Sequence, residues 1–397
     1  MKVMLVAPTH NYLDRNVTFL SFSDFPSGLA YLASALKQAG HDVIGVNPNN
    51  ITGYVSNKVM LADVLTRRIK ETKPGLIGLG GLCTDFAFLR DAIAIIRAAT
   101  DAPIVLGGNI VTNDAEFIHA TLKPDWSVAG DGEGAIVSLA SNLRQGHRVI
   151  RSEPVSVDEL PFPDYEPFGI KEMLDEYSGA TRLLYRYSRP YPRLYSVVAS
   201  RGCPFSCTFC IHGHRDSHYR ARSVPNIIAE IKDAYERYHF NILLLLDELF
   251  AVSKGRLKEF SEAVIQGRKD YGWDFDWTFQ THASAKFDLD TLKLAKEAGC
   301  YMFSYGLESA SPTVLASMNK RICPDQVVEA MHMAEEAKIG FSANLIFGDP
   351  AETDATIRES MAWWIKHCGK AFVFLGFVTP YPGSKIFDDA LAAGRSC

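Results

Sequence analysis

Short apolar runs alternate with longer amphipathic stretches along residues 1–147. Runs rich in aliphatic and β-branched residues predict buried strands, and apolar positions three and four residues apart predict helices. Their alternation predicts a parallel sheet wrapped by helices, a Rossmann-like α/β domain. Strands are expected at 2–7, 42–47, 76–79, 104–106 and 126–129, and helices at 27–38, 61–72, 87–98, 114–121 and after Glu133.

Glycines follow three of these predicted strands, in Gly80-Gly81, Gly107-Gly108 and the run 130–134. In open α/β sheets ligands bind beyond the carboxyl ends of strands, and glycine lets the backbone approach a ligand closely. Glycines also suit tight turns between a strand and a helix. Three such sites along one edge favour a large, flat ligand.

A proline-rich segment, residues 148–193, is expected to be an extended interdomain linker. From residue 194 the alternation resumes, and six βα units predict a partial barrel rather than the eight units of a closed one. The fold class is therefore α/β with two domains, 1–147 and 194–397. The strands of the second domain are expected at 194–200, 241–246, 277–281, 301–305, 340–347 and 372–377.

Composition narrows the class of protein. The chain has 397 residues, 47% apolar and 22% charged, which is typical of a globular protein. The net charge of −5 and the lack of a long basic run argue against nucleic-acid binding. The apolar runs are too short for a signal peptide or a membrane span. Eight cysteines, of which only three cluster, do not form a disulfide framework, so a reducing cytoplasm is expected.

The clustered cysteines are Cys203, Cys207 and Cys210, directly after the first strand predicted for the second domain. Thiolates at this spacing on one loop are able to ligate a single metal centre. A cubane of four irons held by three thiolates keeps one iron open, which suits catalysis. Zinc is the alternative, with a fourth ligand from His212, His214 or His218. A disulfide is the weaker alternative in a cytosolic chain.

Cys-x-x-x-Cys-x-aromatic-Cys after the first barrel strand resembles the signature of the radical S-adenosylmethionine (SAM) superfamily. The resemblance implies that Cys203, Cys207 and Cys210 hold a [4Fe–4S] cluster and that SAM chelates its fourth iron. Electron transfer from a flavodoxin- or ferredoxin-type donor then yields a 5′-deoxyadenosyl radical. Phe209 matches the aromatic residue near the adenine of SAM.

Later strand ends extend the resemblance. Asp247 and Glu248 follow the second barrel strand, where family members bind the SAM amino group, and Glu308 follows the fourth, where a carboxylate lies near the ribose or methionine part. Arg220 or Arg222 is expected to pair with the SAM carboxylate. Each acid taken alone would also suit a helix cap or a surface ion pair. The fifth and sixth strands are followed by the similar segments 347–353 and 379–384. Asn319-Lys320 fits a family pattern and equally fits a solvated surface, and His282 beyond the third strand is expected to be structural.

The glycine pattern of the first domain resembles the cobalamin-binding domain fused to one branch of this superfamily. The resemblance implies that the cobalamin-binding residues are Gly80, Thr84, Gly107, Gly108, Gly130 and Glu133. The histidine motif that supplies a ligand below cobalt in cobalamin mutases is missing from the loop after the first strand. His10 in that loop is expected to make hydrogen bonds rather than to bind cobalt.

The resemblance implies a radical SAM enzyme that methylates an unactivated carbon of a small molecule or peptide, with methylcobalamin as the methyl donor. The alternatives keep the cluster but not methyl transfer: a cyclase, a ring-rearranging or carbon–carbon coupling enzyme, or an enzyme whose first domain binds no cobalamin. A non-catalytic carrier of cobalamin or of the cluster is the alternative from another class.

Overall fold

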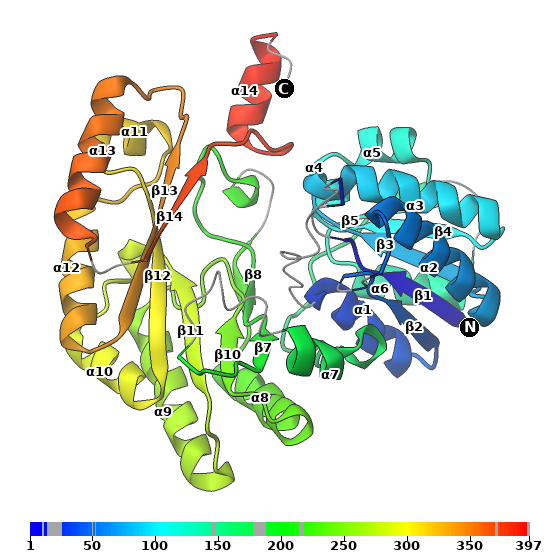
Figure 1. The fold of residues 1–397 in the computed structure, drawn as a ribbon, viewed down its shortest axis with the longest axis horizontal. Coiled ribbons are helices and arrows are strands. Elements are labelled where there is room, and N and C mark those ends of the chain that lie inside the picture. The colour runs from blue at the N-terminus through cyan, green and yellow to red at the C-terminus, as the bar shows by residue number, and fades with distance from the viewer. Residues whose placement is uncertain are drawn as a thin grey trace. The chain divides into compact units, whose positions relative to one another are not determined.

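Figure 1 shows the computed structural model, which describes residues 1–9, 12–13, 26–49, 51, 53–143, 148–177, 188–213, 218–369 and 372–394. The chain divides into two compact units, Met1–Arg186 and Tyr187–Cys397. Two histidines considered above as ligands, His10 and His214, lie outside the described residues. Within the described ranges, no helix combines the length and the apolar character that crossing a membrane requires.

The first unit is built on a six-stranded parallel sheet in the order β2-β1-β3-β4-β5-β6. The direction of strand addition reverses between β1 and β3, and ligands of such sheets bind beyond the carboxyl ends of the strands at this reversal. The strands are β1 (Lys2–Val6), β2 (Asp42–Val46), β3 (Leu76–Gly80), β4 (Ile104–Gly107), β5 (Trp126–Ala129) and β6 (Arg148–Arg151).

Helices cover both faces of this sheet. Helix α2 packs on α3, and α1 packs on α6. Because both faces are covered, the central strand β1 is continuously apolar, and its residues Val3 to Val6 are fully buried. The predicted α/β class is confirmed. The helices are α1 (Ser27–Gln38), α2 (Asn57–Thr72), α3 (Phe86–Ala99), α4 (Asn109–Asn113), α5 (Ala115–Leu122) and α6 (Glu133–Ser141).

Much of the segment expected to be a linker packs on the first unit. Its first residues form β6, which pairs with β5 along its whole length. Further on, a Cβ atom on Gly45 of β2 would lie only 2.3 Å from the carbonyl oxygen of Pro167, so the segment runs directly against β2. Tyr165 is buried beside it, and the short helix α7 (Ile170–Glu172) follows. Proline lacks an N–H donor, but β-branched Val149 and Ile150 favour a strand.

The second unit contains a six-stranded parallel sheet in which every strand lies beside its neighbour in sequence, in the order β7-β10-β11-β12-β13-β14. Successive right-handed βα units that add strands on one side produce a half-barrel. All six strands lie where the sequence predicts them. They are β7 (Leu194–Val197), β10 (Ile242–Leu245), β11 (Asp276–Thr281), β12 (Cys300–Glu308), β13 (Gly340–Phe347) and β14 (Phe372–Phe377).

Helices and one small hairpin complete this unit. The hairpin pairs β8 (Ser200–Arg201) with β9 (Arg220–Ala221) in antiparallel fashion, and the cysteine loop lies between these strands. The helices are α8 (Val224–Tyr238), α9 (Lys254–Tyr271), α10 (Leu289–Glu297), α11 (Pro312–Ser317), α12 (Pro324–Glu336), α13 (Asp354–His367) and α14 (Lys385–Ala392).

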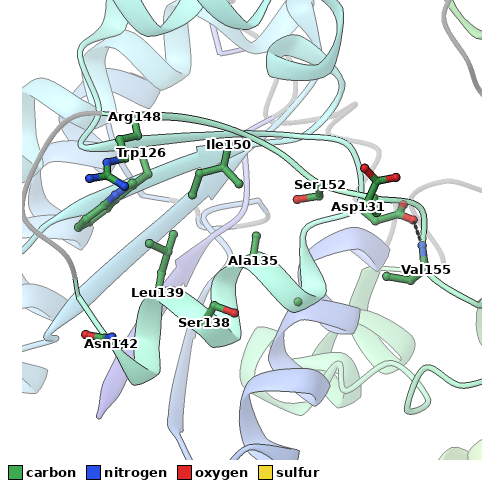
Figure 2. A pocket seen from close by; sticks show the side chains of 12 residues that line it. Trp126, Asp131, Ala135, Ser138, Leu139, Asn142, Arg148, Ile150, Ser152 and Val155 are labelled. Carbon is green, nitrogen blue, oxygen red and sulfur yellow. Dashed lines mark hydrogen bonds between the residues drawn. The ribbon is translucent and has the colours of Figure 1, made fainter.

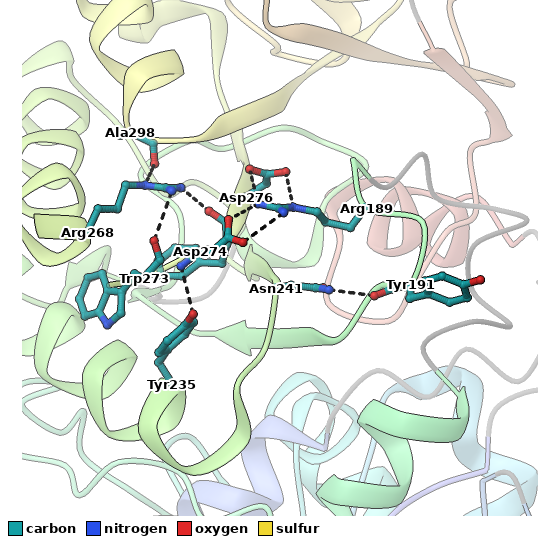
Figure 3. A network of polar contacts seen from close by, with 10 residues as sticks. Arg189, Tyr191, Tyr235, Asn241, Arg268, Trp273, Asp274, Asp276 and Ala298 are labelled. Atoms are coloured by element: carbon teal, nitrogen blue, oxygen red, sulfur yellow. Dashed lines mark hydrogen bonds and ion pairs between the residues drawn. The ribbon is translucent and has the colours of Figure 1, made fainter. Parts of the chain in front are cut away.

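The segment that leads into β7 is fixed at the amino-terminal ends of the strands. Arg189 forms ion pairs with Asp274 at 2.6 Å and with Asp276 at 3.0 Å, and the Nδ2 of Asn241 donates to the Tyr191 carbonyl (Figure 3). The Nε of Arg268 donates to the Ala298 carbonyl at 3.2 Å. These contacts hold the base of the half-barrel, so the opposite ends of the strands are available for chemistry.

Candidate active site

The three clustered cysteines lie beyond the carboxyl end of β7, on the loop that follows β8. Cys207 is buried, whereas Cys203 and Cys210 are half-buried, and all three thiols are free of disulfides. Burial raises the pKa of each, that of Cys210 to about 12, and the charges of Cys207 and Cys203 add to the effect on Cys210. Iron bound here would displace the thiol protons, because iron coordinates the thiolate.

A turn between α11 and α12 holds this loop in shape. The Nδ2 of Asn319 donates to both the carbonyl and the hydroxyl oxygen of Ser206, each at 2.9 Å. The backbone N–H of Thr208 donates to the Met318 carbonyl at 3.0 Å. These bonds join segments more than a hundred residues apart, so the conformation of the cysteine loop depends on the turn.

A buried ion pair lies beside the same loop. Lys320 Nζ donates to Glu308 Oε1 at 2.8 Å, and the two residues are 7% and 8% exposed. The pair rests on Gly306, since a Cβ there would lie 2.2 Å from Glu308 Oε1 and 2.9 Å from Lys320 Nζ. Glu308 has a positive φ of 67°, and the register of β12 with β13 shifts at this point. The end of β12 is therefore shaped around the Glu308 side chain.

Asp247, expected to bind SAM, contacts the backbone that leads to the cysteines. Ser200 Oγ donates to Asp247 Oδ1 at 2.5 Å, and the Ala199 N–H donates to Oδ2 at 3.2 Å. Burial raises the pKa of Asp247 to about 6. Arg256 donates to three backbone carbonyls, including those of Ala199 and Arg222. These contacts fix the turn after β7.

Arg222, also expected to bind SAM, forms a buried ion pair with the protein. Its Nη1 lies 2.5 Å from Glu230 Oε2, with the side chains 4% and 1% exposed. The same guanidinium donates to Asn226 Oδ1 at 2.7 Å and to the Val198 carbonyl at 3.0 Å. Arg222 thus joins the end of β7 to the start of α8.

Glu248 is the more accessible of the two acids after β10. Its Oε1 lies 3.0 Å from His212 Nε2, and half of its side-chain surface is exposed. Hydrogen bonding with Glu248 raises the pKa of His212, and the same bond lowers the pKa of Glu248. The backbone N–H of His212 donates to Cys210 Sγ at 3.5 Å. Glu248 is therefore adjacent to the cysteine loop with part of its carboxylate exposed.

His282 stacks on Phe205 of the cysteine loop, with ring centroids 3.9 Å apart. Its Nδ1 accepts from the Ser284 N–H, and burial, together with the charge of Lys320, lowers its pKa to about 4. Asp349 Oδ2 after β13 and Thr9 Oγ1 after β1 are buried without a hydrogen-bond partner among the described residues. Buried polar atoms of this kind call for a partner, so ligands are expected at these strand ends.

The described residues contain no group of three His, Cys, Asp or Glu side chains arranged around a single ion, and His214, one of the ligands named for zinc, lies outside them. Ligands of one zinc ion lie within bonding distance of the same point. A cubane places each thiolate on a different iron, so its ligands lie further apart. Three free thiols on one supported loop fit such a cluster.

In the first unit, several glycines at the predicted ligand edge pack against the protein backbone. A Cβ on Gly108 would lie 2.7 Å from both N and O of Gly81, and Gly108 has a positive φ of 86°. Gly130 likewise contacts the Ser152 carbonyl. By contrast, Gly80 and Gly107 meet other atoms only at 3.4 Å or more, and Thr84 is exposed beside them. Glu133 is buried at the start of α6. The loops after β3 and β4 thus form one joined edge.

A cavity of about 650 Å³ lies between α6 and the strands β5 and β6. Ala135, Leu139 and Ile150 supply its apolar wall, and Arg148 and Trp126 lie at one end (Figure 2). Asp131 lies at the other end, where its carboxylate accepts from the Val155 N–H at 2.9 Å. The cavity therefore begins at the loop 130–134 that the sequence marks as part of the ligand edge.

Comparison with known proteins agrees with this site. The model of the radical SAM superfamily matches residues 197–363, and that of the B12 binding domain matches residues 23–140. An uncharacterized methyltransferase of Pyrococcus horikoshii is 28% identical, over 99% of this chain and 83% of that protein. An anaerobic magnesium-protoporphyrin IX monomethyl ester cyclase of Cereibacter sphaeroides is 26% identical, over 92% of this chain and 60% of the cyclase.

Solved structures share the fold. The radical SAM methyltransferase TsrM from Kitasatospora setae, with cobalamin and a [4Fe–4S] cluster bound, has a TM-score of 0.76 at 18% identity and covers 99% of this chain and 75% of its own. The cobalamin-dependent radical SAM enzyme OxsB has a TM-score of 0.70 at 16% identity, over 99% of this chain and 55% of its own.

The chain contains a radical SAM domain over residues 197–363, in agreement with its half-barrel and its cysteine loop. It also contains a B12-binding domain over residues 23–140. The cofactors of this class are a [4Fe–4S] cluster, SAM and cobalamin, as the sequence predicts.

Sequence reasoning missed some residues and assigned others to a different contact. Of the two residues left undecided between a family pattern and the surface, Asn319 supports the cysteine loop and Lys320 is buried beside it. The signal was present in the family pattern, but its contact with the loop is non-local. Asp247 and Arg222 form structural bonds to backbone and to Glu230, rather than exposing their charges at the strand ends.

Proposed function

We propose that the chain is a C-methyltransferase that acts on an unactivated carbon of a small molecule or peptide. The observation that carries the proposal is the supported loop of three free thiols at the strand ends of a half-barrel, in a chain with a B12-binding domain. When bound, the cluster supplies the electron that cleaves SAM to a hydrogen-abstracting radical, and cobalamin supplies the methyl group.

Cys203, Cys207 and Cys210 hold the cluster in this proposal. Glu248 is the acid best suited to the SAM amino group, because its carboxylate is half exposed beside the cysteine loop. Phe209 offers its ring to the adenine. Asp247 and Arg222 act indirectly, by fixing the turn after β7, and this role is supported by their burial and hydrogen bonds.

For cobalamin, the proposal uses Gly80, Thr84, Gly107, Gly108, Gly130 and Glu133 at the carboxyl edge of the first sheet. Gly80 and Gly107 leave backbone accessible there, and the buried Thr9 hydroxyl lacks a partner among the described residues at the end of β1. The cavity beside α6 has room for an apolar part of the cofactor. The boundaries proposed for the domain that binds it are 1–147, with β6 of the following segment completing its sheet.

Methyl transfer is favoured over the other outcomes because several relatives are named for it. A hopanoid C-3 methylase of Methylococcus capsulatus is 26% identical over 97% of this chain and 72% of that protein. The cyclase relative supports the second candidate, a radical cyclization without methyl transfer. The reductant in either case is proposed to be a flavodoxin- or ferredoxin-type donor of the cytoplasm.

The test uses the full chain reconstituted with iron, sulfide and cobalamin, and incubated with methyl-labelled SAM and a one-electron reductant. We expect a cobalamin absorbance spectrum on the purified protein, 5′-deoxyadenosine as a product, and label in the methylated substrate. Cys210→Ala should abolish 5′-deoxyadenosine, whereas Cys83→Ala, at a half-buried cysteine of the first unit, should not.

The outcomes separate the candidates. 5′-Deoxyadenosine without transfer of label to any added substrate would refute methyl transfer and favour the cyclase. Cluster-loaded protein that makes no 5′-deoxyadenosine would identify a non-catalytic carrier. Protein that retains no cobalamin would refute the assignment of the first unit as a cofactor domain.

A further inference from the structure

Lys320 is a buried cation in the turn that holds the cysteine loop. It lies in the turn that donates to Ser206 and accepts from Thr208, and its Nζ is 6.0 Å from the centre of the Phe209 ring. Phe209 in turn lies between Cys207 and Cys210 in sequence. The Lys320 ammonium is therefore adjacent to the loop that holds the cluster ligands.

The ion pair with Glu308 places a fixed cation beside the cysteine loop. Lys320 Nζ lies 2.8 Å from Glu308 Oε1 and 6.0 Å from the centre of the Phe209 ring, so the positive member of the pair is near the loop residue between two of the cysteines. Lys320 is buried, and charges interact more strongly in a low-dielectric interior than in water.

The pair is also costly to build. Gly306 must lack a side chain beneath it, Glu308 adopts a positive φ, and both charges lose water. Burial of an ion pair contributes little to stability, and apolar residues of similar volume often serve as well. A structural role alone therefore gives a weak account of this arrangement.

We propose that Lys320 raises the reduction potential of the cluster held by Cys203, Cys207 and Cys210, and that Glu308 limits this effect. A cluster that gains one electron becomes more negative, so a fixed cation beside it favours the reduced state. The inference rests on the proposed function, because it requires that the three cysteines hold a redox-active cluster.

The experiment is a potentiometric titration of the reconstituted full chain, followed by electron paramagnetic resonance of the reduced cluster, without SAM. Lys320→Met should shift the one-electron equilibrium at least tenfold towards the oxidised state, a midpoint about 59 mV lower. Lys320→Arg should restore most of the shift. Glu308→Gln should move the midpoint in the opposite direction, because it removes the opposing charge and keeps a hydrogen-bond acceptor.

The matched control is Lys293→Met, which removes a lysine from the exposed pair with Glu336, 3.7 Å apart in the same unit. Its midpoint should equal that of the wild type. Equal midpoints in Lys320→Met and wild type, or shifts of the same sign in Lys320→Met and Glu308→Gln, would overturn the inference. If Lys320→Met assembles no cluster, the midpoints of Glu308→Gln and Lys320→Arg test the inference instead. A Glu308→Gln midpoint that is not higher than that of the wild type would then overturn it. Wild-type protein that assembles no cluster would contradict the proposed function itself.

Discussion

The buried pair of Arg222 and Glu230 allows a quantitative test of how the turn after β7 is held. The Glu230 side chain is 1% exposed, and in Arg222→Met the Tyr195 hydroxyl, 3.4 Å away, stays as its side-chain partner among the described residues. Removal of one member of a buried ion pair costs about 3–5 kcal/mol. The Asn226 and Val198 bonds of Arg222 are lost as well. We expect the free energy of unfolding to fall by about 4 kcal/mol.

The double variant Arg222→Met, Glu230→Leu should recover most of this loss, since two apolar side chains leave no buried charge. Arg237→Met is the matched control on the same helix, because its pair with Asp233 is exposed and contributes less than about 1 kcal/mol. The assay is urea unfolding of the cluster-free chain followed by tryptophan fluorescence. Four of the five tryptophans, Trp273, Trp277, Trp363 and Trp364, lie in the second unit and report on it.

The same variants test whether Arg222 binds SAM. A residue that acts only by holding the turn can be replaced by the apolar pair, so the folded, cluster-loaded double variant should bind SAM within about threefold of the wild type. Loss of a direct charged contact to the SAM carboxylate would cost about 2–5 kcal/mol, thirtyfold or more in affinity. Wild-type stability in Arg222→Met, or such a loss of SAM affinity in the stable double variant, would refute the reasoning.

Three further changes test other parts of the structure. Burial raises the pKa of Asp247 to about 6, above its unfolded value of about 4. Its contribution to stability is therefore full below pH 4 and is lost as the pH rises through 6. Relative to Asp247→Asn, the wild-type unfolding free energy should fall by about 2 kcal/mol from pH 4 to 7, and a constant difference in urea titrations would contradict this. Gly108→Ala should destabilise the first unit by about 1–3 kcal/mol, because Gly108 has a positive φ and a Cβ there would meet the Gly81 backbone. The control Gly134→Ala, with no atom near its Cβ, should stabilise α6 by about 0.5 kcal/mol. Equal melting temperatures of the two variants would refute the contact. Ala135→Trp should fill the cavity beside α6 and weaken cobalamin retention at least tenfold. Phe117→Trp, at an exposed position of α5, should leave cobalamin retention unchanged. Unchanged cobalamin absorbance of Ala135→Trp after gel filtration would exclude this cavity from the cofactor site.

The amino-acid sequence by itself determined the fold class, the six strands of the half-barrel and the position of the cysteine loop. These features depend on local patterns: a parallel strand covered on both faces is a continuous apolar run, and a strand end is marked by glycine or by a change of period. Three thiols within eight residues, Cys203 to Cys210, must share a loop whatever else the chain does. The cofactors followed from the family resemblance that this spacing and the glycine edges carry, because the spacing alone also allowed zinc or a disulfide.

The tertiary structure alone decided which polar groups are partners. The sequence places Lys320 and Asn319 more than a hundred residues after the cysteines, and only the packing of the α11–α12 turn on the loop brings them together. For the same reason Asp247 and Arg222 bond to backbone and to Glu230, and residues 148–151 join the first sheet as β6. A carboxylate or guanidinium satisfies its charge with whatever burial places beside it, and burial is a non-local property of the chain.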